Sequence, residues 1–315
     1  MYAQILVPLD GSKFAESALP LALTLSRKTG ADLHLVTVIE PVPAFVYDEW
    51  ETAAEEWTRE YLANVVADVG PKAGGHVSVG ILKGHVVDAL QTEVAERKAD
   101  LVVLASHGRG AISRLWLGSV ADRFLRQADR PVLVVRPEAD EGRTEPDGEP
   151  AFDTLLVPLD GSELSESALD HAIEFGELFG SAYHLTRVVA YPVELASPYL
   201  PHTAQMNQQL LADAKDRAAE YLEERAERMR RRGLRVTTAI SVDGQAGHGI
   251  LTECEAVEAD GVAMATHGRK GLSRALLGST ADKVLRGLHV PLLLHRPKGS
   301  KVPASDGATD RSAAV

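Results

Sequence analysis

Two glycine-containing turns carry residue types that suit the binding of a phosphate chain. The first turn, Ser106-His107-Gly108-Arg109, follows an apolar run, and nine residues separate Gly108 from the pair Gly118-Ser119. A glycine turn followed by a helix N-terminus offers free backbone amides and the positive end of a helix dipole. The hydroxyl of Ser119 can donate a further hydrogen bond, and Arg109 can offset phosphate charge. The spacing therefore predicts an anion site.

The same arrangement recurs later in the chain. Thr266-His267-Gly268-Arg269 leads through nine residues to Gly278-Ser279, with Thr280 at the place of Val120. A structural alternative exists, because residues 119–122 and 279–282 also match the capping box that many helices use. We favour the functional interpretation because the glycine spacing occurs twice. His107 and His267 have no cysteine, histidine or carboxylate near them at ligand spacing, so we interpret them as turn residues and expect no metal site built from protein side chains.

A carboxylate follows the first apolar run of each half. Asp10 comes two residues after Pro8, and Asp160 comes two residues after Pro158. At the end of a strand, a carboxylate can accept hydrogen bonds from a sugar hydroxyl or a base amine, although Asp-Gly-Ser is also a common turn. The chain has no G-x-x-x-x-G-K-[ST] sequence, and no G-x-G-x-x-G follows the first run, which argues against P-loop ATPases, kinases and dehydrogenases.

These motifs belong to an internal repeat. Asp10 and Asp160 are 150 positions apart, whereas Gly108 and Gly268 are 160 apart, so the second copy carries ten extra residues in its middle. We predict a first domain over residues 1–137, an acidic linker over 138–151 and a second domain over 152–297. Residues 298–315 are poor in apolar side chains and are expected to be a disordered tail.

Each copy alternates short apolar runs with helical patterns. In the first copy the runs cover residues 4–9, 32–39, 76–82, 100–105 and 131–135. The first helix should begin after Ser12 and end at Gly30, with a possible kink at Pro20, and its counterpart should begin after Ser162 and end at Gly180. Long helices are expected over 49–69 and 204–232. The predicted fold class is α/β: two tandem doubly wound, Rossmann-like domains, each with a five-stranded parallel sheet of order 3-2-1-4-5. The ligand crevice of such a sheet lies at the carboxyl ends of strands one and four.

Composition narrows the classes of partner. The chain has 315 residues, and its 45% apolar side chains are typical of a globular protein. Its net charge of −12 repels phosphate backbones and anionic lipids. We therefore expect neither nucleic acid nor a membrane as a partner. The N-terminus shows no signal-peptide pattern, which makes a cytoplasmic location the default expectation. The single cysteine, Cys254, lies in an apolar helical stretch and is interpreted as a buried small side chain.

The combined motifs resemble the universal stress protein family over almost the whole chain, once per half. The resemblance rests on the Asp-Gly-Ser strand end, the Ser/Thr-His-Gly-Arg turn, the nine-residue spacer to Gly-Ser and the closing apolar strand. It implies that each half binds ATP together with Mg²⁺ or Mn²⁺, the metal being held through phosphate oxygens and water. The residues implied are Pro8, Asp10, Val38, Ala105, His107, Gly108, Arg109, Gly118, Ser119 and Val120, and in the second half Pro158, Asp160, Val188, Ala265, His267, Gly268, Arg269, Gly278, Ser279 and Thr280.

One departure from the family pattern recurs. The first glycine of the pattern is Ala105 in one half and Ala265 in the other. A left-handed backbone there would cost an alanine about 1 to 2 kcal/mol and would weaken binding without abolishing it.

The resemblance also implies a mode of assembly and a role. The closing strands of the two halves should pair and form a pseudo-dimer within the chain, with further homo-oligomers possible and the protein partner unknown. The first functional hypothesis is an ATP-binding regulator of the stress response. The alternatives are a structural or interaction module that binds no nucleotide, and a slow ATPase. We expect no more than slow hydrolysis, because the recurring carboxylates lie on the adenosine side of the crevice.

Overall fold

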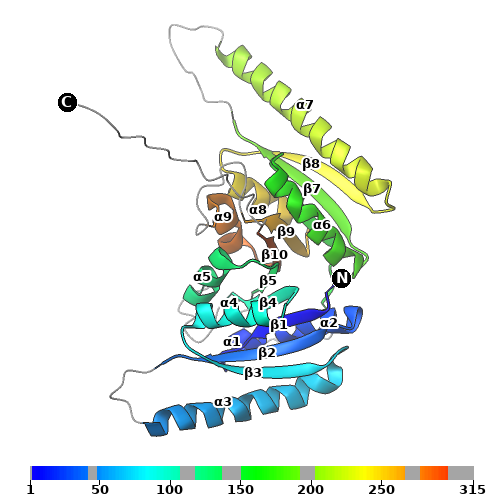
Figure 1. Ribbon diagram of the computed structural model, residues 1–315. Coiled ribbons are helices and arrows are strands. Elements are labelled where there is room, and N and C mark those ends of the chain that lie inside the picture. Colours follow the sequence, from blue (N-terminus) through cyan, green and yellow to red (C-terminus); the bar gives the residue numbers. More distant parts are fainter. Residues whose placement is uncertain are drawn as a thin grey trace, which may run out of the picture.

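The strands of both halves form one continuous sheet. The computed structural model describes residues 2–41, 48–106, 118–136, 150–191, 203–266 and 277–296. The ten strands lie in the order β3-β2-β1-β4-β5-β10-β9-β6-β7-β8 (Figure 1). In the first half they are β1 (Gln4–Pro8), β2 (Asp32–Ile39), β3 (Val77–Lys83), β4 (Leu101–Ala105) and β5 (Val132–Val135). In the second half they are β6 (Thr154–Pro158), β7 (Ala182–Val189), β8 (Val236–Val242), β9 (Gly261–Ala265) and β10 (Leu292–His295).

The predicted order 3-2-1-4-5 is confirmed in each half. All neighbours within a half are parallel. The apolar runs of the sequence became these strands because helices cover both faces of a parallel sheet, so that every residue of β4 and β9 is buried. In the first half, where strand bounds were predicted from the sequence, the strand ends differ from the predicted ends by one residue at most.

The helices form two layers. The helices of the first half are α1 (Lys13–Glu16), α2 (Leu19–Thr29), α3 (Asp48–Val69), α4 (Val86–Glu96) and α5 (Ser119–Gln127), with a 3₁₀ turn at Gly70–Lys72. Those of the second half are α6 (Glu163–Glu177), α7 (Thr203–Arg230), α8 (Ala246–Ala256) and α9 (Ser279–Gly287). Side chains of α1, α2, α3, α6 and α7 pack into one core cluster, and those of α4, α5, α8 and α9 pack into the other. Each cluster runs through both halves.

The predicted first helix is correct at its ends and wrong in its middle. Ser12 caps α1 by accepting a hydrogen bond from the Ala15 amide at 3.2 Å, and Gly30 ends α2 with φ = 73°. Between α1 and α2 the helix is interrupted, and Pro20 lies in the first turn of α2, where its missing N–H costs nothing. In the second half, where Asp170 replaces the proline, α6 is continuous. It ends at Glu177, and Gly180 closes the following turn with φ = 69°.

The two halves join through their closing strands. Leu133 of β5 lies opposite Leu293 of β10 in an antiparallel pair, and both side chains are buried. The predicted pairing of the closing strands is therefore confirmed. The segments 137–149 and 297–315, which contain nearly all of the predicted linker and the tail, lie outside the described residues.

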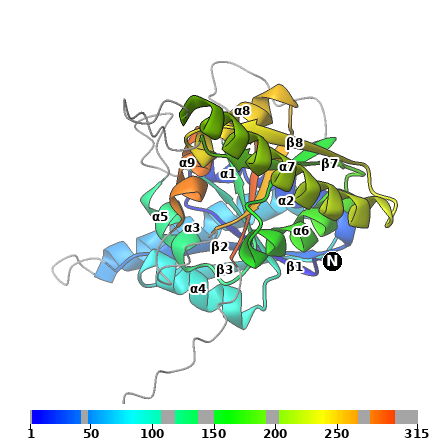
Figure 2. The ribbon, with the colours of Figure 1, turned by 90° about the horizontal axis from the view of Figure 1, so that it is seen from above.

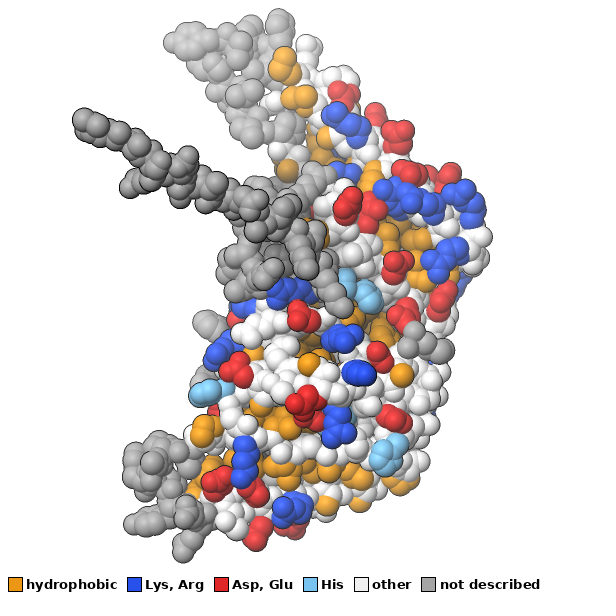
Figure 3. Space-filling view, viewed as in Figure 1, with side chains coloured by type: hydrophobic (Ala, Val, Ile, Leu, Met, Phe, Trp, Pro, Cys, Tyr) orange, Lys and Arg blue, Asp and Glu red, His pale blue; other side chains and the backbone are white. Residues whose placement is uncertain are grey.

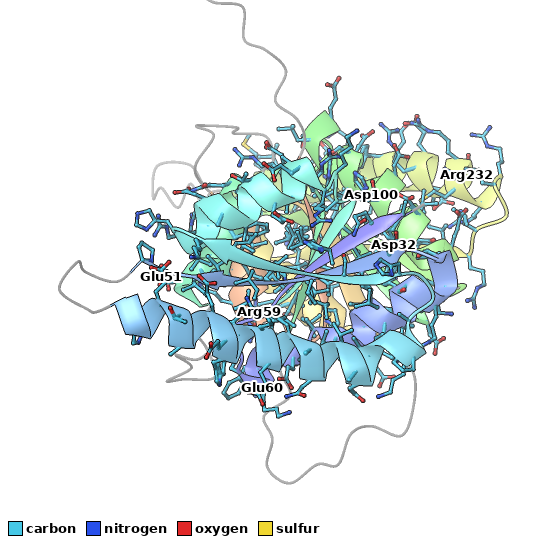
Figure 4. The ribbon with its side chains drawn as sticks, turned by 60° about the horizontal axis from the view of Figure 1, so that its bottom comes forward. Asp32, Glu51, Arg59, Glu60, Asp100 and Arg232 are labelled. Carbon is cyan, nitrogen blue, oxygen red and sulfur yellow. The ribbon has the colours of Figure 1, made fainter. Side chains whose placement is uncertain are left out.

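Polar side chains fix the amino ends of the strands, opposite the predicted crevice. The Asp100 carboxylate accepts hydrogen bonds from the amides of Ala3 and Gln4 at 2.8 and 3.0 Å, and Asp32 accepts one from the His76 amide at 2.7 Å (Figure 4). Acidic and basic side chains are interspersed over the face in Figure 3, and basic ones gather most densely over the C-terminal end of α7. Cys254 is buried as predicted, and burial raises the pKa of its thiol to about 11.

Candidate functional site

A tight turn places a carboxylate at the carboxyl end of β1. The Oδ1 atom of Asp10 accepts hydrogen bonds from the Ser12 amide at 2.9 Å and from the Ser12 hydroxyl at 2.6 Å. Gly11 lies between them with φ = 81°, a left-handed conformation that favours glycine. The turn interpretation of Asp-Gly-Ser is thus correct. It holds the Asp10 side chain in one orientation beside the end of the strand.

The second half repeats this turn with nearly the same geometry. Asp160 Oδ1 accepts from the amide and the hydroxyl of Ser162 at 2.9 and 2.6 Å, and Gly161 has φ = 84°. Asp10 and Asp160 are both partly exposed, so a ligand at the strand ends could reach them. Pro8 and Pro158 are the last strand residues before the two turns.

The main chain of β2 extends past the end of β1. The Leu9 amide donates to the Val36 carbonyl at 2.8 Å, which shows that the backbone groups of Val36 face β1. Because these groups alternate from side to side along a strand, those of Val38 also face this side, but beyond the end of β1. In the second half the Leu159 amide donates to the Thr186 carbonyl at 2.8 Å, which leaves Val188 in the matching position. Both valines therefore present backbone to the predicted crevice.

The N-terminus of α5 lies at the end of β4. Gly118 is the N-cap residue, and its amide donates to the Ser106 carbonyl at 2.8 Å. Ser119 is the first helical residue and is exposed, as is Val120. The capping-box alternative is wrong here, because the cap is one residue earlier and Asp122 instead binds Arg126 of the next turn. The tertiary bond to Ser106 joins the start of the helix to the residue after β4.

The helix α9 opens in the same way. The Gly278 amide donates to the Thr266 carbonyl at 2.9 Å, and Gly278 is again the N-cap residue. No described side chain caps either helix. The amides of the first three helical positions have no intrahelical acceptors, so Ser279 and Thr280, like Ser119 and Val120, begin a turn suited to an anion.

The middle of each predicted phosphate turn lies outside the described residues. This applies to His107, Gly108 and Arg109, and to His267, Gly268 and Arg269. Ala105 and Ala265 are the last residues of β4 and β9. Neither belongs to the described non-glycine residues with positive φ, so the cost of a left-handed alanine does not arise in this conformation.

The halves differ along α3 and α7, the long helices that pack against β3 and β8. In the second half the Tyr221 hydroxyl donates to Glu166 at 2.9 Å, and the guanidinium groups of Arg187 and Arg225 lie 5.0 and 4.8 Å from the Tyr221 ring. In the first half the equivalent Tyr61 stacks on Trp57, with ring centroids 5.6 Å apart. Burial and the nearby carboxylate of Glu16 raise the pKa of Tyr61.

This difference was not predicted from the sequence, although the repeat carries the signal for it. At the 150-residue offset Thr37 aligns with Arg187, and at the 160-residue offset Trp57 aligns with Arg217. The 160-residue offset also relates Arg136 to Arg296, for which the sequence predicted no role.

Two absences hold for the described part of the chain. It contains no cluster of three or more histidine, cysteine, aspartate or glutamate side chains arranged to hold a metal ion. Among the same residues, no helix is long and apolar enough to span a membrane.

The fold and the site define a class of protein: a tandem α/β chain with matching polar turns and open helix N-termini at the carboxyl ends of strands one and four of each half. The family model of the universal stress proteins matches residues 1–136 and again residues 151–296. The chain belongs to the universal stress protein family.

Relatives confirm the tandem organisation. A universal stress protein of Mycobacterium tuberculosis is 29% identical over 301 residues, which cover 93% of this chain and 96% of the relative. A universal stress protein of Thermus aquaticus is 31% identical over 137 residues, which cover 43% of this chain and all of the relative. Among solved structures, a universal stress protein from Archaeoglobus fulgidus shares the fold, with a TM-score of 0.70 at 20% identity over 93% of this chain and 98% of that one.

Proposed function

We propose that each half binds one ATP molecule in the crevice between the ends of its first and fourth strands, and that the protein acts as a nucleotide-dependent regulator in the stress response. One observation carries the proposal. In both halves, the last helix begins at a glycine whose amide donates to the carbonyl of the residue after strand four, and no described side chain caps this helix. In both halves, a tight turn also fixes an aspartate at the end of strand one.

The parts of this crevice suit different parts of the ligand. The Asp10 carboxylate and the Val38 backbone offer polar groups to adenosine, and the N-terminus of α5 offers amides and the Ser119 hydroxyl to phosphates. Asp160, Val188 and Ser279 take these roles in the second half. Mg²⁺ or Mn²⁺ would accompany ATP through phosphate oxygens and water. Hydrolysis is not part of the proposal, because both aspartates lie on the adenosine side.

The test separates the phosphates from adenosine. We expect equilibrium dialysis with ATP and Mg²⁺ to give two sites per chain. The double substitution Ser119→Ala with Ser279→Ala should weaken ATP binding about tenfold, since each hydroxyl contact to a charged oxygen contributes about 1.5 kcal/mol, and should leave adenosine binding within twofold.

Thr92→Ala is the matched control. It removes the hydroxyl of an exposed helical residue on α4 that donates to the Asp88 carbonyl, and it should change neither affinity. Equal losses for ATP and adenosine would contradict the assignment of the helix N-termini to phosphate. Absence of binding by the unsubstituted protein would favour the alternative of an interaction module without nucleotide.

A further inference from the structure

The two helices that open the proposed sites lie side by side across the junction of the halves (Figures 1 and 2). On α5, Arg126 binds Asp122 through two hydrogen bonds of 2.9 and 2.8 Å, and on α9 Arg286 binds Asp282 at 2.9 and 3.1 Å. The pairs also approach each other, with Arg126 to Asp282 at 3.6 Å and Arg286 to Asp122 at 3.9 Å. Charges therefore alternate in a ring that joins both helices.

An arginine from each half binds the end of the other half's helix. Arg136 follows β5, and its Nη2 atom donates to the carbonyls of Leu285 and Arg286 in the last turn of α9, at 2.6 and 2.7 Å. Arg296 follows β10 and donates to the Arg126 carbonyl in the last turn of α5. A guanidinium at a helix C-terminus satisfies carbonyls that lack intrahelical partners and interacts favourably with the helix dipole.

The same two segments also touch the phosphate turns of their own halves. The Ser106 amide, at the start of the first turn, donates to the carbonyl of Val135 at 2.8 Å, and Val135 directly precedes Arg136. The Thr266 amide donates to the carbonyl of His295 at 2.9 Å, and His295 directly precedes Arg296. Two adjacent residues thus connect the turn of one site to the helix of the other.

We propose that Arg136 is a positioning residue for the ATP site of the second half, that Arg296 is one for the site of the first half, and that the two sites are thereby coupled. This inference rests on the proposed function. A nine-residue helix is about 13 Å long and moves as a stiff rod, so a ligand that fixes its N-terminus and an arginine that fixes its C-terminus act on the same element. Without the arginine, part of the free energy of ligand binding must be used to order the helix, so the ligand binds more weakly.

The experiment uses the full chain with one site silenced at a time. Ser119→Glu and Ser279→Glu each place a negative charge at a helix N-terminus and should exclude ATP from the first or the second site. In the Ser119→Glu background, Arg136→Gln should raise the dissociation constant for ATP at the second site about fivefold. In the Ser279→Glu background, the same substitution should change the first site by less than a factor of about two. Arg296→Gln should give the opposite pattern.

Two further variants separate positioning from general stability. Arg136→Lys keeps one charged donor and should recover part of the affinity. Arg130→Gln, in the turn at the other end of β5, should leave both sites unchanged and serves as the matched control. Thermal unfolding of every variant reports changes in stability alone.

The outcomes distinguish the two proposals. If Arg136→Gln weakens the first site alone, weakens both sites equally or changes neither, the coupling is overturned while ATP binding stands. If the unsubstituted chain binds no ATP, the proposed function fails, and the coupling fails with it. Loss at the second site alone, with partial recovery by lysine, supports the coupling.

Discussion

Two histidines distinguish the second half from the first at the level of single residues. The rings of His171 on α6 and His295 on β10 are in contact, with centroids 4.0 Å apart. Among the described atoms, His295 Nδ1 is buried without a hydrogen-bond partner. The equivalent positions of the first half hold Leu21 and Val135. Burial, together with the neighbouring His171, lowers the pKa of His295 to about 4, and burial also lowers the pKa of His171.

This pair predicts acid sensitivity. The folded protein binds a proton at His295 less readily than the unfolded chain does, so the contribution to stability is full above about pH 6.5 and falls as the pH drops toward 4. Between pH 7 and pH 5 the free energy of unfolding should fall in the unsubstituted protein. We expect this fall to be about 1 to 2 kcal/mol smaller in the double variant His171→Leu with His295→Val. Urea unfolding at both pH values measures this difference, and equal losses in the two proteins would refute the prediction.

At the level of elements, one proline explains why matching segments fold differently. The segment with Pro20 forms α1 and α2, whereas the segment with Asp170 forms the continuous helix α6. Pro20 lies in a first turn, but position 170 lies in the interior of a helix, where proline would remove a hydrogen bond and clash with the preceding turn.

Adding proline at position 170 and removing it at position 20 should therefore change stability by different amounts. We expect Asp170→Pro to destabilise the protein by about 3 kcal/mol. Pro20→Ala should change stability by less than about 1 kcal/mol. Asp170 is exposed, so Asp170→Ala is the control for loss of the side chain alone. Chemical unfolding measures all three variants, and similar effects of the two proline exchanges would contradict this account.

The elements were largely predictable from sequence, including the helix starts at Gly118-Ser119 and Gly278-Ser279. Apolar runs predicted the strands of the first half, because burial on both faces of a parallel sheet demands such runs, and the repeat predicted those of the second half. Only the capping-box alternative placed the cap one residue too late, at Ser119 instead of Gly118. The bond from Gly118 to Ser106 joins residues that no local pattern relates. A buried polar contact on the strand at 32–39 was also not predicted: the two ring nitrogens of His34 lie 2.8 Å from Glu93 Oε1 and from Ser78 Oγ. Such partners come from distant segments and become visible only in the folded chain.

The described part of the chain is organised around one sheet, with β3 and β8 as its outer strands. β3 and β8 each pair on one side, whereas β5 and β10, the outermost strands of their separate halves, pair with each other. Arg136 and Arg296 add contacts across this junction. We therefore expect β5 and β10 to be as stable against local opening as the inner strands of each half.

Hydrogen exchange measures the stability of this junction. We expect the amides of β5 and β10 to exchange as slowly as those of β1 and β4, because all four strands have neighbours on both sides. Amides of β3 and β8 should exchange faster, since among the described residues each of these strands has a neighbouring strand on one side only. Mass spectrometry of proteolytic fragments resolves these strands. Exchange of β5 and β10 at the rate of β3 would show that the halves separate in solution.

Pairing of β5 with β10 inside one chain changes how the two halves can evolve. In an assembly of two identical chains, every mutation appears twice, and any change that suits one copy is imposed on the other. Here Trp57 and Tyr61 stack in one half, while two arginines flank Tyr221 in the other. Fusion thus fixes a one-to-one ratio of the halves and lets natural selection act on each separately, so that one half can acquire a new chemistry while its partner retains the old one.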